Sequence, residues 1–124
     1  MTTTIDGLIE EYTRRYVAHD AKGVADLCHV PFLAVREGRT IHLPDHAAVV
    51  DHFEKAMDAY RAAGYVSFAP VELDPHQLGE RAAFVTVRWH ALDRAGGVAR
   101  DSRTTYHLLT TEGGWRFLSY TNHF

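Results

Sequence analysis

Apolar residues are spaced as in helices in the first half of the chain and alternate as in strands in the second half. The helical periodicity predicts three helices. One spans residues 4–19, a second spans residues 21–28 after the capping residue Asp20, and a third begins after Asp45 and ends at Gly64. Everything after Gly64 has the period of strands.

Short alternating runs separated by turn residues predict the strands. They span residues 32–35, 40–43, 65–73, 81–93, 98–110 and 115–124. Glu37-Gly38 marks the turn of the first hairpin, and a loop at residues 75–79 follows the long strand after the third helix. Short turns at residues 95–97 and 112–114 make the last three strands antiparallel neighbours.

This order of elements predicts the α+β fold class. The helices are expected to pack on one face of a strongly curved antiparallel sheet, which forms a cone with an internal pocket. The chain has 124 residues, 46% of them hydrophobic, which is enough for one contiguous core. A single domain over residues 1–124 is therefore expected.

The two faces of the sheet follow from the alternation along residues 81–93, where Ala83 and Trp89 belong to the set that faces the helices. Counting outward from two-residue turns at Ala95-Gly96 and Glu112-Gly113 predicts the partners of that set on the next strands. The expected rows are Ala83, Leu108 and Phe117; Val85, Tyr106 and Ser119; Val87, Thr104 and Thr121; and Trp89, Ser102 and His123.

Polarity rises along these rows, and this predicts a pocket at one end of the inner face. The polar set consists of Ser102, Thr104, Tyr106, Ser119, Thr121 and His123. Each buried hydroxyl without a partner costs about 1–3 kcal/mol, so a close-packed core would not hold them together. The alternative is a register slip of one residue, which would turn the same set toward solvent or a dimer interface.

The outer face of the sheet mixes aromatic, aliphatic and cationic residues, which predicts a homodimer formed through this face. Its candidate interface residues are Phe84, Arg88, Arg103, His107, Leu118 and Tyr120. The alternative is a solvated surface.

Three segments carry a resemblance to a known family: RRYVAHD, DAKGVADLC and the closing GGWRFLSYTNHF. Together with the order of elements they resemble the NTF2-like superfamily, which includes SnoaL-like polyketide cyclases, ketosteroid isomerase, scytalone dehydratase and nuclear transport factor 2. The resemblance covers nearly the whole chain. It implies the cone-shaped fold, and it specifies fold better than function.

Comparison with ketosteroid isomerase implies roles for a few residues. Tyr16 stands where that family carries a pocket tyrosine that donates to the substrate oxyanion, and Tyr106 falls on or beside its second donor. The family's aspartate base would fall within residues 32–36, where no carboxylate occurs before Glu37. A ketosteroid-type isomerase is therefore disfavoured.

The candidate site combines these residues with the polar rows. The candidate catalytic residues are Tyr16, Tyr106 and His123, and the candidate ligand-binding residues are Tyr12, Arg36, Trp89, Ser102, Thr104, Ser119 and Thr121. Arg36 could point into the pocket and bind a carboxylate or phenolate oxygen, or it could face solvent from the turn. Trp89 could form a wall for a ring-shaped ligand or belong to the core.

Charge and residue composition limit which partners, locations and metals are expected. The net charge is −3 and the cations are scattered, so neither nucleic acid nor a membrane is an expected partner. No signal or membrane-spanning segment is apparent, and the single cysteine, Cys28, favours a cytoplasmic location. His42 and His46 do not share a helical face, so no metal is expected, and no cofactor is expected either.

The resulting expectation is a protein that binds a small, largely apolar molecule, aromatic or polycyclic, in the pocket of the cone. Isomerase, cyclase or dehydratase activity of the SnoaL-like type is left open. The alternative is a non-catalytic ligand-binding or protein-interaction module that acts as a dimer.

Overall fold

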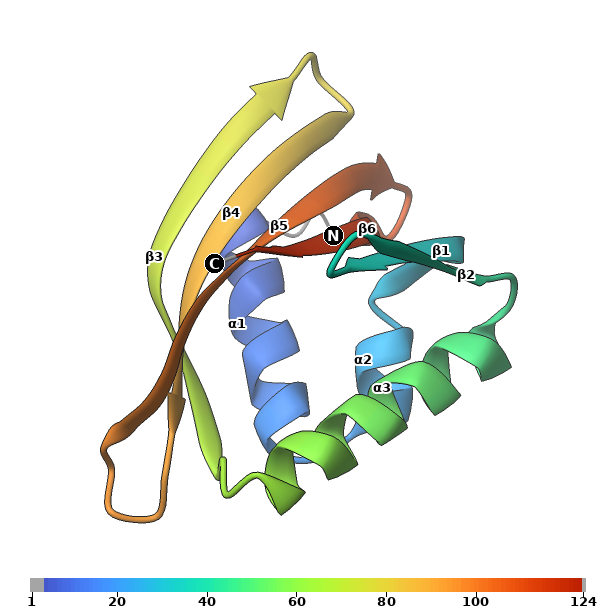
Figure 1. Cartoon of the computed structure of the whole chain (residues 1–124). Coiled ribbons are helices and arrows are strands. Elements are labelled where there is room, and N and C mark those ends of the chain that lie inside the picture. The colour runs from blue at the N-terminus through green and yellow to red at the C-terminus, as the bar shows by residue number, and fades with distance from the viewer. Residues whose placement is uncertain (1–3, 124) are drawn as a thin grey trace.

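The computed structural model describes residues 4–123, which form helices on one side of a six-stranded sheet. The helices are α1 (Ile5–Val17), α2 (Ala21–Ala25) and α3 (His46–Ala62). The strands are β1 (Cys28–Arg36), β2 (Arg39–Leu43), β3 (Ser67–Leu78), β4 (Ala82–Leu92), β5 (Val98–Thr111) and β6 (Gly114–His123). Figure 1 shows the sheet curling around α1, with α2 and α3 on the same side. The predicted α+β cone is confirmed.

Polar side chains fix the start of each helix. Thr4 accepts a hydrogen bond from the backbone of Gly7, Asp20 from Gly23, and Asp45 from Ala48. The second helix is shorter than predicted, because Cys28 opens β1 instead of ending α2. Among the described residues, no helix is long and apolar enough to cross a membrane.

The strand order is β2-β1-β6-β5-β4-β3. All neighbours are antiparallel except β1 and β6, which pair in parallel and join the hairpin of β1 and β2 to the last strand. The first hairpin turns at Glu37-Gly38 as predicted, and both residues have positive φ, at 53° and 77°. This conformation suits a two-residue hairpin and favours glycine.

The strand after α3 is longer than predicted. The expected loop at residues 75–79 is wrong, because β3 continues through Pro75 to Leu78. Proline is tolerated there because β3 lies at the edge of the sheet and pairs with β4 alone.

The predicted register between β4 and β5 is confirmed, with Val85 opposite Tyr106 and Trp89 opposite Ser102. The turn itself differs, since Asp93 bonds Gly97 across a three-residue loop instead of a two-residue one. A register shift beyond Ala91 compensates for that extra residue.

The register between β5 and β6 changes along the strands. Near the turn it follows the prediction, with Leu108 opposite Phe117, but the next pair is His107 with Ser119. Leu118 is therefore an extra residue in β6, a β-bulge that reverses the facing of everything beyond it. Phe124, the expected last residue of the strand, lies outside the described residues.

The core fills the space between the helices and the inner face of the sheet. Its largest side chains with almost no solvent exposure are Phe32, Phe117, Leu8, Ile9 and Leu108. They come from both helices and strands, so the curvature of the sheet and the position of α1 depend on one shared core.

Leu108→Ala should lower the free energy of unfolding by about 2–5 kcal/mol, because the side chain is fully buried and its loss leaves a cavity. Leu78→Ala is the matched control, since Leu78 is 37% exposed on the edge strand, and it should cost less than about 1 kcal/mol. Urea unfolding measures both. Equal losses would contradict this placement of the core.

Candidate ligand-binding site

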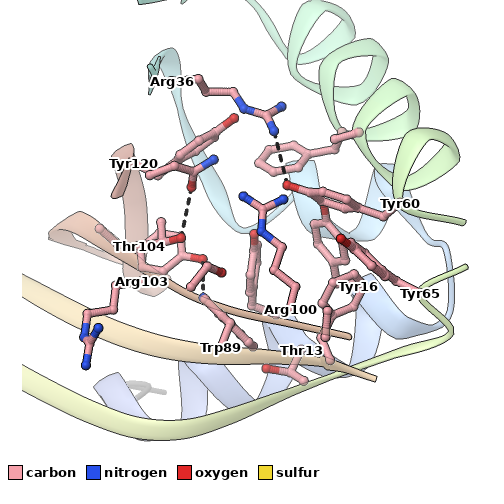
Figure 2. A pocket seen from close by; sticks show the side chains of 18 residues that line it. Thr13, Tyr16, Arg36, Tyr60, Tyr65, Trp89, Arg100, Arg103, Thr104 and Tyr120 are labelled. Atoms are coloured by element: carbon pink, nitrogen blue, oxygen red, sulfur yellow. Dashed lines mark hydrogen bonds between the residues drawn. The ribbon is translucent and has the colours of Figure 1, made fainter. Parts of the chain in front are cut away.

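A cavity opens between α1, the C-terminal half of α3 and the inner face of β3 to β6 (Figure 2). It encloses about 70 Å³, and about 730 Å³ when the space open to solvent at its mouth is included. All six tyrosines of the chain line it. They are Tyr12, Tyr16, Tyr60, Tyr65, Tyr106 and Tyr120.

Aromatic rings close the inner end of the cavity. Tyr12 lies 4.9 Å from Phe117, 5.6 Å from Tyr106 and 6.0 Å from Trp89, measured between ring centroids. The indole nitrogen of Trp89 donates to the hydroxyl of Tyr106 at 3.2 Å. Burial raises the pKa of both Tyr12 and Tyr106, so both phenols are neutral donors and acceptors.

Arg36 enters the cavity from the end of β1. Its Nη2 donates to the hydroxyl of Tyr60 at 3.2 Å, and the side chain is half-buried. Within residues 4–123, no carboxylate lies within salt-bridge distance of its guanidinium. The sequence left open whether Arg36 faces solvent or the pocket, and the structure places it in the pocket.

A second arginine, Arg100, lies on β5 opposite Ala91 and also points into the cavity. In Figure 2 the guanidinium groups of Arg36 and Arg100 approach the same space from different strands. Among the described residues that line the cavity, none is Asp or Glu. The described lining of the cavity thus carries arginine side chains and no carboxylate, although the whole chain has a net charge of −3.

Tyr120 and His52 form a hydrogen-bonded pair beside Arg36. The Nε2 atom of His52 lies 2.6 Å from the hydroxyl of Tyr120. Burial, and then the charge of Arg36, lower the pKa of His52 below its ordinary value near 6.5. Burial raises the pKa of Tyr120 to about 12, and Arg36 opposes that rise. At neutral pH the pair is an uncharged imidazole bonded to an uncharged phenol.

Thr104 and Ser102 supply further polar groups on β5. Thr104 is 7% exposed and donates through its hydroxyl to the side-chain oxygen of Asn122 at 2.9 Å. Ser102 lies on the same face near the mouth. The residues that sequence analysis placed in the site and that line the cavity are Tyr12, Tyr16, Arg36, Trp89, Ser102, Thr104 and Tyr106.

Three predicted site residues lie outside the cavity because of the bulge at Leu118. Ser119 pairs with His107 and Thr121 with Thr105, on the outer face of the sheet. His123 bonds the hydroxyl of Thr105 at 2.7 Å on that same face. The inner positions belong instead to Tyr120 and Asn122. For the same reason Tyr120, predicted in the dimer interface, is 6% exposed and faces inward.

Some lining residues were not predicted, and their signals differ in strength. Arg100 continues the inner alternation of Ser102 and Thr104, so one more row of the register would have found it. Tyr60 belongs to the apolar stripe of α3, a pattern that by itself predicts a core residue and not a ligand contact. His52 has no sequence signal, because it lies beside that stripe and only the bulged strand brings Tyr120 to it.

Among residues 4–123, no group of three or more His, Cys, Asp or Glu side chains is arranged to hold a metal ion. The ligands that this cavity can hold are therefore those recognised by arginine, phenol and aromatic rings.

Arg36→Gln should raise the pKa of His52, because the substitution removes a nearby positive charge that disfavours the imidazolium. An NMR titration of the His52 ring resonances measures this shift. Arg61→Gln changes an exposed arginine on α3, the helix that carries His52, and should leave the His52 titration unaltered. Identical His52 titrations in wild type and Arg36→Gln would contradict the described proximity.

Comparison with known proteins identifies the fold. The chain is similar to an NTF2-like protein of unknown function from Shewanella oneidensis, with a TM-score of 0.75 and 12% identity over 95% of this chain and 94% of that one. The chain is also similar to an NTF2-like protein with a cystatin-like fold from Novosphingobium aromaticivorans, with a TM-score of 0.71 and 20% identity over 93% of this chain and 75% of that one. A third similar structure is a protein of unknown function from Nostoc punctiforme, with a TM-score of 0.75 and 9% identity over 98% of this chain and 93% of that one.

Comparison with curated proteins gives no match. The structural likenesses have too little identity to carry a function, and they establish the fold alone. The finer SnoaL-like assignment stays a prediction. The model of one family, described as NTF2-like protein (DUF6841), matches residues 3–124. The chain therefore belongs to this NTF2-like family.

Proposed function

We propose that the protein binds a small organic anion, a carboxylate attached to a single aromatic or apolar ring, in the tyrosine-lined cavity. The observation that carries this proposal is the half-buried guanidinium of Arg36, which has no carboxylate of residues 4–123 within salt-bridge distance and lies in a cavity whose described lining holds no acidic residue.

The electrostatic argument rests on Arg36. A half-buried guanidinium has lost part of its hydration, and the neutral hydroxyl of Tyr60 compensates for only part of that loss. A carboxylate would form two parallel charge-assisted hydrogen bonds with the planar fork of the arginine. The side chain is therefore poised for an anionic group.

The walls favour a ring. Phe68, Tyr16 and Tyr60 pack edge to face beside the arginines, with the ring of Phe68 5.3 Å from Tyr16 and 5.6 Å from Tyr60. Such rings accept another aromatic ring in tilted or T-shaped contact. Away from the arginines, the walls of the cavity therefore consist mainly of ring surface.

The size of the cavity limits the ligand. Pockets for drug-sized molecules typically measure about 300–1,000 Å³, whereas this cavity encloses about 70 Å³. The rings of Tyr12, Trp89 and Phe117 fill the inner end where a polycyclic body would lie. A single ring near the mouth is favoured over the polycyclic ligand that the sequence also allowed.

Benzoate should bind wild-type protein, and its neutral isostere benzamide should bind at least tenfold more weakly, because only benzoate pairs with the arginines. Arg36→Gln should weaken benzoate binding roughly 10- to 100-fold, since a hydrogen bond to a charged group contributes about 1.5–3 kcal/mol. Chemical-shift titration of the cavity residues measures these affinities.

The control is Arg81→Gln, which removes an exposed arginine at the turn between β3 and β4. Its affinity for benzoate should equal that of wild type. Equal binding of benzoate and benzamide, or no effect of Arg36→Gln, would overturn the proposal.

We also propose, as the basis for the alternative function of an interaction module, that two copies associate through the outer face of the sheet. Phe84 is 39% exposed there, and its ring lies 4.7 Å from that of His107. Arg88 bonds Asp101 and Glu72 on the same face, so charge and apolar surface lie together. Tyr120 has no part in this surface because it is buried.

Phe84→Glu should shift the protein from dimer to monomer in sedimentation velocity experiments, because it places a charge in the apolar part of that face. Val17→Glu changes an equally exposed apolar residue at the end of α1 and should leave the dimer intact. A wild-type monomer at high concentration would disprove the association.

A further inference from the structure

Two hollows lie on either side of the pair formed by Tyr120 and His52. Tyr120 lines the tyrosine-lined cavity, whereas His52 lines a second hollow of about 440 Å³ between α3 and the hairpin of β1 and β2. Arg36 and Ala56 border both. We call the second hollow the α3 groove. The hydrogen bond of 2.6 Å between the two side chains therefore crosses the wall between the cavity and the α3 groove.

We propose that Tyr120 and His52 form a proton relay between a ligand in the cavity and water in the α3 groove. This inference rests on the proposed binding of an aromatic carboxylate. It adds an activity, proton transfer at a ligand atom next to a carbonyl group, with Tyr120 as the catalytic residue and His52 as a positioning residue that acts through it.

Both ends of the relay are open. The hydroxyl of Tyr120 borders the cavity and, in Figure 2, points toward the guanidinium of Arg36. Within residues 4–123, the buried side-chain atoms without a hydrogen-bond partner are His90 Nε2 and Thr110 Oγ1. The Nδ1 atom of His52 has no hydrogen bond in the described structure and is not among these buried atoms, so it keeps contact with solvent. Because His52 lines the α3 groove, Nδ1 can exchange a proton with water there.

The steps balance. In one direction the ligand carbon loses a proton to the oxygen of Tyr120, the proton of that hydroxyl passes to Nε2 of His52, and the proton on Nδ1 leaves to water. Both residues stay neutral, and the imidazole changes tautomer. The electron pair of the broken C–H bond forms the C=C bond of an enolate, whose negative charge is stabilised by the nearby positive charge of Arg36.

The reverse steps return a proton to the ligand and restore the first tautomer of His52. A reaction that removes one proton and returns one therefore leaves the relay ready for another cycle. Keto–enol isomerisation has this balance, whereas a net deprotonation would leave the imidazole in the wrong tautomer. The geometry thus favours an enolisable aromatic keto acid as the substrate class.

Phenylpyruvate is the probe, because it carries a ring, a carboxylate and an enolisable carbon. Wild-type protein in D₂O should accelerate the exchange of its C3 protons for deuterium, followed by proton NMR. Tyr120→Phe and His52→Ala should each slow this exchange roughly 10²- to 10⁴-fold, the usual contribution of general acid–base catalysis. His76→Gln, an exposed change on β3, is the control and should exchange at the wild-type rate.

Chemical rescue distinguishes a proton-transfer role of His52 from a purely structural role. His52→Ala leaves an opening toward the α3 groove, so added imidazole should restore exchange in that variant and not in Tyr120→Phe. The pH profile should also follow His52, with activity falling as acid protonates it. The groups around it are Arg36 from β1, Arg39 from β2, Tyr120 from β6, and Asp51 and Lys55 from α3.

Affinity for phenylpyruvate, measured on the same samples by chemical-shift titration, distinguishes the two proposals. Binding to wild type without accelerated exchange, or full exchange in Tyr120→Phe, overturns the relay and leaves ligand binding intact. Rescue of the exchange rate of His52→Ala by imidazole, with unchanged affinity for phenylpyruvate, supports the relay. Absence of phenylpyruvate binding overturns the relay, whereas the comparison of benzoate with benzamide decides the binding proposal.

Discussion

The extra residue in β6 is the constraint on which the site depends. With Leu118 bulged out of the ladder, Phe117 and Tyr120 both face the helices although three positions separate them. A regular strand could not place two such residues on one face, because its side chains alternate. The bulge therefore brings Tyr120 to His52 and Asn122 to Thr104. It also places Ser119, Thr121 and His123 on the outer face.

The cavity combines groups that would be unfavourable in a dry core. Arg36 and Arg100 approach a space walled by tyrosines, and the hydroxyl of Tyr60 accepts a hydrogen bond from Arg36 there. Tyrosine suits this role because its ring packs like a hydrophobic residue while its hydroxyl stays available. The interior is thus well packed at its closed end and polar at its mouth. A ligand with an apolar body and an anionic head matches both parts.

Much of this arrangement could be predicted from sequence because it depends on local periodicity. Helix caps at Asp20 and Asp45, the turn at Glu37-Gly38 and the pairing of β4 with β5 all follow from short-range rules. The bulge could not be predicted, because the residues around Leu118 include no glycine or proline that would mark it. That single residue explains the misplaced side chains of β6. His52 was missed for a related reason, since its partner comes from the far end of the described chain.

The parallel pairing of β1 with β6 also has a consequence for folding kinetics. Arg36 and Tyr120 are separated by most of the sequence, and β6 must insert between β1 and β5 before they meet. Such non-local contacts form late, since closing a long loop costs entropy before any contact compensates for it. A chain without β6 would lack Tyr120 and also the pairing that holds β1, and with it Arg36, against the rest of the sheet. The tyrosine-lined cavity is therefore complete only once β6 has paired with both β1 and β5.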